Sequence, residues 1–571
     1  MNLIERYYLH TRSPFAELTR FFFDGLLRPE WMNQDGSFQT RLIQILSAIF
    51  CAGIFFPREL RRTYAILHAL PDPVRYRVQA SSDWMLAMLL ISLIVAVWTV
   101  MQWRSLFPSG RDHMILTPQP VSRSQLFGAK LAALLIFVTL FILVLNLTCG
   151  ITLPAVASGR WEPRPLWLRV AALLAGSIGL AYFPCLALLA LQGVLMAILS
   201  IRWFESVSFL VQALLLFALL CAFPLISYLP VHEAVATIPP WLEWFPPGWF
   251  WALAERIAGS RNPAIVHLAS RAEASLLLAA FIAATSYVIS YVQFNRYALE
   301  IVGARSGPLM DWSALFARLF PSAQSRGVSE FVLRTLLRGR QQKLTVVLIA
   351  GMGVALVVDG WFNANYVAPR HQTALSVMRE AVVSMPLTLS FFSLLAVRRA
   401  FRTPSTLPAN WIFRFFETRA ATRQELNSMF LTFLLIAGVP PIAACGLIEW
   451  AVFGRDAIAI LLVESLMMVA FAEYLFRNWC SIPFTFLLNP ARRHFIQSAS
   501  IHLGEFTIYS LISGFIVLRG TIDHSVWMVQ ATIACVLVFW FDRQRRAAIA
   551  NAPLEFTEPA SDAIEVLRLL D

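Results

Sequence analysis

Apolar stretches long enough to cross a lipid bilayer recur along the whole chain. A bilayer core is about 30 Å thick and a helix rises about 1.5 Å per residue, so roughly 20 apolar residues cross it. Such segments lie near 40–57, 84–103, 126–153, 170–199, 206–229, 274–295, 344–362, 381–397, 427–448, 457–476, 503–518 and 524–541. Lipid cannot satisfy an open backbone, so each segment must be helical. The sequence predicts an all-α polytopic membrane protein with about 12 transmembrane helices, or ten or eleven if the shortest segments do not cross.

The composition excludes a soluble globular protein, because 58% of the residues are hydrophobic and only 14% are charged. The net charge of +12 is spread between the apolar segments, so we expect no nucleic-acid partner. The seven cysteines are scattered, mostly inside apolar runs, which indicates packing and no disulfide framework. The first residues carry Glu5 and Arg6 and lack an apolar core, so we expect no cleaved signal peptide.

An amphipathic pattern precedes the first apolar segment. Phe15, Leu18, Phe22 and Leu26 fall on one helical stripe, and charged residues cluster opposite. The pattern predicts an N-terminal amphipathic helix in the membrane interface. A packed cytosolic helix is the alternative.

The largest polar loop, Arg296 to Lys343, is basic and divides the apolar segments into six before and six after. Because six is even, both groups begin on the same side, which is the pattern of a parallel repeat. The predicted organisation is an interfacial helix in 1–39, a first transmembrane half in 40–297, a basic cytoplasmic linker in 298–343, a second half in 344–541 and an acidic cytoplasmic tail in 542–571.

The distribution of positive charge favours two cytoplasmic termini, because most lysines and arginines then lie in cytoplasmic segments. One loop opposes this rule, since it places Arg58, Arg61, Arg62, Arg75 and Arg77 outside. We interpret that loop as an interfacial or re-entrant segment.

Two polar passages, called elbows below, join the second and third apolar segments of each half. The first elbow is Arg104–Gln125 and the second is Arg398–Glu425. Both contain prolines and arginines, which favour a defined conformation over a flexible linker. We predict that the elbows are docking surfaces, and the alternative is that they only terminate the flanking helices.

Motifs for catalysis are missing from the sequence. No G-x-x-x-x-G-K-[ST] phosphate loop occurs, so the chain is not expected to hydrolyse ATP. None of the nine histidines is paired at helical ligand spacing with another His or Cys, which argues against a metal site. No G-x-S-x-G nucleophile elbow occurs either. We therefore expect a protein that is not an enzyme.

Two glutamates inside the tenth apolar segment are candidate functional residues, because ionisable side chains are expensive in a membrane. Glu464 and Glu473 are nine residues apart, about two and a half turns, so they face opposite sides of one helix. The spacing predicts an ion pair of Glu473 with Arg477. Glu464 is predicted to make a buried contact between helices or to take part in transport.

The motifs of the elbows resemble one family. The matching residues of the first elbow and its flanks are Trp103, Leu106, Phe107, Pro108, Arg111, Asp112, Leu116, Pro118, Pro120, Val121, Ala129 and Lys130. Further matches in the same order are Pro246, Pro247, Trp249 and Phe250, then Pro408, Ala409, Asn410, Trp411, Phe413 and Arg414, then Ile482, Pro483, Phe484 and Thr485. This pattern resembles the permeases of bacterial ABC transporters of the type-two export superfamily.

The resemblance implies a transmembrane export subunit in the bacterial inner membrane without its own ATPase. Its elbows would dock separate ABC ATPase subunits, which bind the ATP and Mg; this chain would bind no cofactor. The implied docking residues are Phe107, Pro108, Arg111, Asp112, Pro118 and Pro120 in the first elbow and Trp411, Arg414 and Glu417 in the second. The two halves would form a pseudo-dimer within one chain, or two copies would pair. An ion-coupled secondary transporter and a membrane scaffold are the alternatives.

Overall fold

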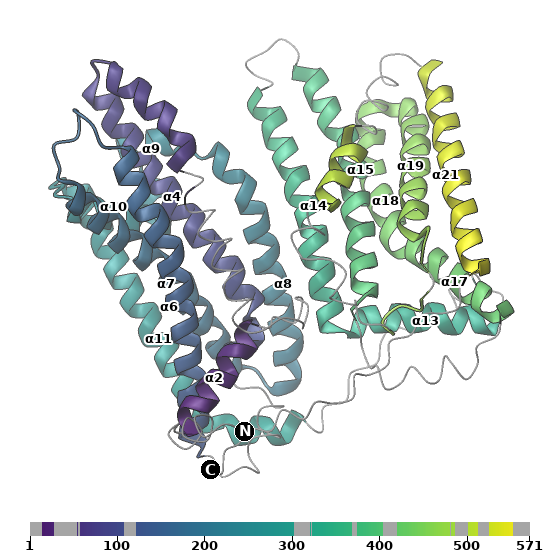
Figure 1. Cartoon of the computed structure of the whole chain (residues 1–571), viewed down its shortest axis with the longest axis horizontal. Helices are drawn as coiled ribbons and strands as arrows, with labels where there is room; N and C mark the ends of the chain where they lie inside the picture. Colours follow the sequence, from purple (N-terminus) through teal and green to yellow (C-terminus); the bar gives the residue numbers. More distant parts are fainter. Residues whose placement is uncertain are drawn as a thin grey trace, which may run out of the picture.

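A computed structural model describes residues 14–27, 57–107, 122–301, 322–367, 374–403, 419–479, 481–485, 501–511 and 525–551, with the single residues 54 and 320. Within these ranges the chain is almost entirely helical and contains no strand. The helices form two bundles that stand side by side (Figure 1). Two amphipathic helices, α2 (Pro14–Leu27) and α13 (Ala323–Arg338), lie at one end, called the lower end as in that view.

Among the described residues, the first bundle contains five long helices, and shorter α-helical segments lie at its opposite, upper end. The long helices are α4 (Pro73–Met101), α6 (Arg123–Val156), α7 (Leu166–Ile198), α8 (Ile201–Leu225) and α11 (Pro263–Ile301). The shorter segments are a helix over 57–69, α9 (Val231–Thr237) and α10 (Pro246–Ile257). Helix α10 packs against α4, α7 and α11. A Cβ atom at Gly176 of α7 would lie 2.8 Å from the carbonyl oxygen of Phe250, so only glycine permits this approach.

The second bundle contains α14 (Arg340–Val367), α15 (Ala374–Phe401), α19 (Ala457–Phe476), α21 (Ser525–Asn551) and a longer helical path between the second elbow and α19. That path runs through α17 (Arg419–Phe433), the π-helical turn η6 (Leu434–Gly438) and α18 (Val439–Phe453). Buried aromatic rings fill the core, with Phe391 stacked on Phe471 at 4.6 Å between ring centroids. Stacked aromatic pairs add to the burial of apolar area.

Helices of membrane-spanning length are the main feature of both bundles. Nine helical stretches in the described ranges are long and apolar enough to cross a bilayer. One of them, Arg423–Phe476, turns back at η7 (Gly454–Asp456) and therefore holds two candidate crossings. These stretches confirm an all-α polytopic protein built for a membrane. Of the predicted segments, 40–57 falls almost wholly outside the described residues, and 503–518 is described, as helix, only to residue 511.

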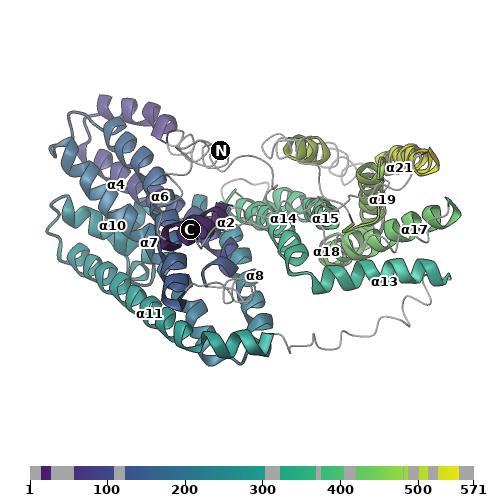
Figure 2. The same cartoon turned by 60° about the horizontal axis from the view of Figure 1, so that its bottom comes forward.

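Helices α8 and α14 form the seam between the bundles (Figure 2). Near the lower end, the Gln212 side chain donates from Nε2 to the Val100 carbonyl at 2.8 Å. Its Oε1 accepts a hydrogen bond from Nη2 of Arg340 at 2.7 Å. Because the Gln212 side chain is fully buried, these bonds fix α4 and α8 to the first turn of α14.

The apolar stripe of α2 is covered by protein. Leu18, Phe22 and Leu26 are buried against α6, and Lys130 of α6 lies 4.5 Å from the centre of the Phe22 ring. Most of the stripe therefore packs against protein, while Phe15 and Phe21 remain exposed. The interfacial character of α2 stays a prediction for that exposed face.

Candidate functional site

The central part of the first elbow, with Pro108, Arg111, Asp112, Pro118 and Pro120, lies outside the described residues. Its two flanks are described and firmly held. On the entering side, the Trp103 indole donates from Nε1 to Oγ of Ser208 at 2.7 Å, and the Phe107 ring stacks on Tyr287 at 5.2 Å.

The first elbow ends at a helix cap. Ser122 and Gln125 form a capping box, in which each side chain accepts a hydrogen bond from the other residue's backbone N–H. On the other side of the elbow, Gln102 at the end of α4 donates to the carbonyl of Leu26, the penultimate residue of α2, at 3.2 Å. The first elbow is therefore bounded by α2, α4 and α6.

The second elbow has an equivalent attachment. Its central residues, with Trp411, Arg414 and Glu417, lie outside the described residues. Gln342 of α14 donates from Nε2 to the carbonyl of Thr403 at 3.2 Å, and the N–H of Phe484 donates to the carbonyl of Phe401 at 2.8 Å. Phe484 has a φ of 67°, a conformation that bulky residues rarely adopt. Its ring packs edge-to-face on Phe401, which helps to hold this strained turn under the elbow.

Helix α13 is the counterpart of α2 in the second bundle. It packs along α17, the helix that follows the second elbow, as α2 packs along α6 after the first. Thr432 donates to Ser329 at 2.8 Å within the contact, and Gln324 donates to Glu425 at the end of the elbow at 2.8 Å. Sequence reasoning placed 323–338 in a linker, although Val328, Val332 and Leu336 at helical spacing carry the signal for this buried face.

The predicted pairing of Glu473 with Arg477 is wrong. Glu473 accepts from Nε and Nη2 of Arg545 in α21, at 2.6 and 3.2 Å. Arg545 also donates to Asn427 at 2.8 Å and to Asp542 at 3.0 Å, and its guanidinium lies 4.3 Å from the centre of the Phe430 ring. Arg477 instead lies over the Tyr474 ring at 4.2 Å. The planar guanidinium of Arg545 donates to acceptors on three helices at once. A pair of Glu473 with Arg477, one turn apart on α19, would not make as many hydrogen bonds.

Glu464 lies beside another glutamate, Glu449 of α18. Both side chains are fully buried, and their carboxyl groups are neighbours. None of the four carboxyl oxygens makes a hydrogen bond among the described residues. The sequence prediction of a buried contact between helices for Glu464 agrees with this position, but it did not single out Glu449.

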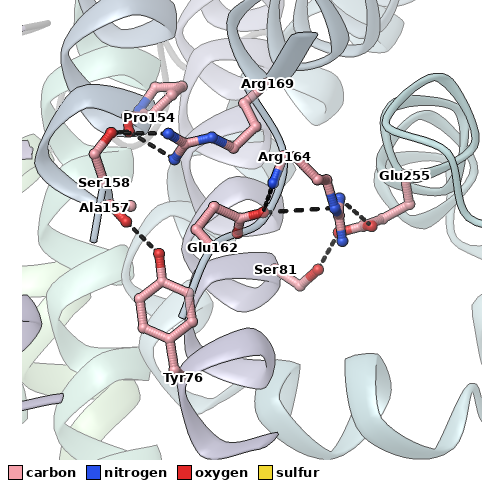
Figure 3. A network of polar contacts seen from close by, with 9 residues as sticks. All are labelled: Tyr76, Ser81, Pro154, Ala157, Ser158, Glu162, Arg164, Arg169 and Glu255. Carbon is pink, nitrogen blue, oxygen red and sulfur yellow. Dashed lines mark hydrogen bonds and ion pairs between the residues drawn. The ribbon is translucent and has the colours of Figure 1, made fainter. Parts of the chain in front are cut away.

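A polar network ties together the upper end of the first bundle (Figure 3). Arg164 donates to Glu255 of α10 at 3.3 Å, and Ser81 of α4 donates to the same carboxylate. Arg169 donates to the carbonyl of Pro154 at 2.9 Å, and the Tyr76 hydroxyl donates to the carbonyl of Ala157. These bonds close the turn between α6 and α7 and fasten it to α4 and α10.

Tyr64 extends this network to the helix over 57–69. Its hydroxyl donates to Oδ2 of Asp83 in α4 at 2.7 Å, and Gln79 donates to the other oxygen at 2.9 Å. Burial, and then the neighbouring Asp83 carboxylate, raise the pKa of the Tyr64 hydroxyl well above its ordinary value. Tyr64 therefore acts as a permanent donor, and the network serves structure at this end.

No group of three or more potential metal ligands occurs in the part of the chain that the structure describes. The polar features of this chain include a buried ion pair, a pair of neighbouring carboxyl groups and the anchored flanks of the two elbows. Comparison with known proteins adds no further constraint: no family model, no curated protein and no solved structure matches this chain.

Proposed function

We propose that this chain is the membrane-spanning subunit of an ATP-driven ABC exporter, located in the bacterial inner membrane with both termini in the cytoplasm. The two elbows would dock separate ATPase subunits, which bind ATP and Mg and supply the energy. The chain itself would bind no cofactor, and its twelve predicted helices would form two parallel halves of one pseudo-dimer.

The observation that carries the proposal is the matching support of the two elbows. In each bundle an amphipathic helix, α2 or α13, packs along the helix that follows the elbow. In the first bundle, Gln102 beside the start of the elbow donates to the carbonyl of Leu26 in α2, and in the second, Gln342 of α14 donates to the carbonyl of Thr403 within the elbow. Both amphipathic helices lie at the lower end (Figure 1). A segment that transmits force between subunits must be held on both sides in this way.

The experiment that tests the proposal is affinity purification of the tagged chain from bacterial membranes, with mass spectrometry of the proteins that accompany it. A stoichiometric P-loop ATPase is expected, and Arg111→Glu and Asp112→Ala should release it without loss of the folded chain. The matched control is Arg455→Glu, an exposed arginine in η7 at the opposite end of the second bundle. Retention of the ATPase by both elbow variants would contradict the docking role.

A second candidate, an ion-coupled secondary transporter, is favoured by the Glu449–Glu464 pair. Two carboxyl groups in contact and away from water hold a proton between them more readily than two charges. Buried acidic residues of this kind carry protons in membrane transporters. Transport that stops on Glu464→Gln and on collapse of the proton gradient would support this candidate, and transport indifferent to ionophores would exclude it.

A further inference from the structure

Five arginines crowd the upper end of the first bundle, where the positive-inside pattern leaves them unexplained. Arg58, Arg61 and Arg62 lie on the helix over 57–69, and Arg75 and Arg77 lie in the first two turns of α4. All five side chains are exposed. In the described ranges none of them makes an ion pair with an acidic side chain.

The acidic residues near this end are few, and several are engaged elsewhere. Asp83 accepts from Tyr64 and Gln79, and Glu255 accepts from Arg164. Asp72 caps α4 by accepting from the N–H groups of Val74 and Arg75, and Glu59 is exposed on the helix over 57–69. The five arginines outnumber these two exposed carboxylates, so the face keeps a net positive charge that attracts an external anion.

The orientation of the helix over 57–69 is fixed by its inner face. Tyr64 and Leu67 are buried against Tyr76 and Ala157. The helix therefore turns its arginines outward, and apolar side chains on it and at the start of α4 are largely exposed. Ile66 is 63% exposed and Val74 is 68% exposed. Basic and apolar side chains mixed on one exposed face are typical of a surface that rests in the headgroup region of a bilayer.

The position of this exposed face along the bundle also fits contact with lipid headgroups. The helix over 57–69 lies beside the upper ends of α4 and α6, where their apolar stretches stop (Figure 1). At the same end Trp167, in the first turn of α7, is 70% exposed, and Trp244, just before α10, is 84% exposed. Exposed tryptophans mark the level of the lipid headgroups. The five arginines therefore stand near the height of the lipid phosphates.

We propose that the helix over 57–69 and the start of α4 form a binding surface for the phosphate groups of anionic phospholipids. Each arginine near such a surface attracts an anionic headgroup, and the guanidinium can bind a phosphate through two parallel hydrogen bonds. Ile66 and Val74 enter the boundary between headgroups and acyl chains. This surface requires neither the proposed ATPase nor a particular orientation of the chain, so it stands apart from the proposed function.

The test is titration of the purified full-length chain with short-chain phosphatidylglycerol or phosphatidylcholine, followed by native mass spectrometry. The wild-type chain is expected to prefer the anionic lipid. The triple variant R58Q/R61Q/R62Q should lose on the order of tenfold or more of that preference, whereas R58K/R61K/R62K should keep most of it, since the charge remains. The charge-matched control is R379Q/R455Q/R543Q, three exposed arginines of the second bundle.

Further measurements test whether the effect comes from lipid binding and not from loss of folding or from another ligand. The melting temperature of each variant in phosphatidylcholine reports folding, which should not change because the three side chains are exposed. The variant I66S/V74S should weaken both lipids. An equal preference in the wild type and the glutamine variant would overturn the proposal. Complete competition by inorganic phosphate, or the recovery of an acidic protein on this face in place of lipid, would overturn it as well.

Discussion

Helix α19 carries two buried glutamates whose surroundings differ completely. Glu473, near the lower end, is paired with Arg545 and shares that guanidinium with Asn427 and Asp542. Glu464, near the upper end, lies beside Glu449, and neither carboxyl group has a hydrogen-bond partner among the described residues. Two buried glutamates of one helix therefore differ: one forms an ion pair, and the other lies against a second carboxyl group. Burial alone does not set the role of a charge; the partner does.

The largest effect is expected from breaking the ion pair. Glu473→Gln leaves Arg545 buried with a weakened partner, which should destabilise the fold by about 3–5 kcal/mol. The measurement is the midpoint of unfolding of the purified chain in detergent. The double variant Glu473→Gln/Arg545→Met should recover part of the loss, because no uncompensated charge remains. A single variant as stable as the wild type would contradict the pairing.

The carboxyl pair should respond in the opposite sense. Glu464→Gln replaces one of two neighbouring buried carboxyl groups with a neutral amide of similar shape, so stability is expected to be retained or to rise by about 1 kcal/mol. The measurement is the midpoint of chemical unfolding of the variant and of the wild-type chain in the same detergent. A loss as large as that of Glu473→Gln would contradict this contrast, because it would mean that Glu464 makes an ionic interaction on which the fold depends.

A smaller effect should separate the ion pair from its support. Asn427 accepts one hydrogen bond from Arg545 and carries no charge. Asn427→Ala should therefore destabilise the fold by about 1–2 kcal/mol, less than Glu473→Gln. Chemical unfolding of both variants under one condition gives the ranking, and the reverse order would mean that Asn427 and not Glu473 is the main partner of Arg545.

The smallest effect is expected at the residue that sequence spacing favoured. Arg477 stacks on Tyr474, and no ion pair joins it to Glu473 in the part of the second bundle that the structure describes. Arg477→Gln should change stability by only about 0.5 kcal/mol. A loss as large as that of Glu473→Gln would restore the pairing along α19.

The contrast along α19 also shows which structural features the sequence predicts and which it does not. The apolar segments predict the long helices well, because the membrane and not the neighbouring helix dictates their length and their internal hydrogen bonds. The partner of Glu473 could not be predicted, since Arg545 lies 72 residues away and reaches it only through the packing of α21 on α19. Glu449 could not be predicted for the same reason, because it meets its neighbour Glu464 only across the turn at Gly454. The docking residues of both elbows remain predictions.

The two hydrogen bonds of Gln212, at the seam between the bundles, can form only in a fixed order during synthesis of the chain. The first partner of Gln212, the carbonyl of Val100, precedes it in the chain, but its second partner, Arg340, follows 128 residues later. At a synthesis rate of about 5–20 residues per second, Arg340 emerges roughly 6–26 s after Gln212. During that interval the side-chain oxygen of Gln212 must be satisfied by water or by the insertion machinery. The first bundle therefore enters the membrane with an open polar site on α8, which only the second bundle closes.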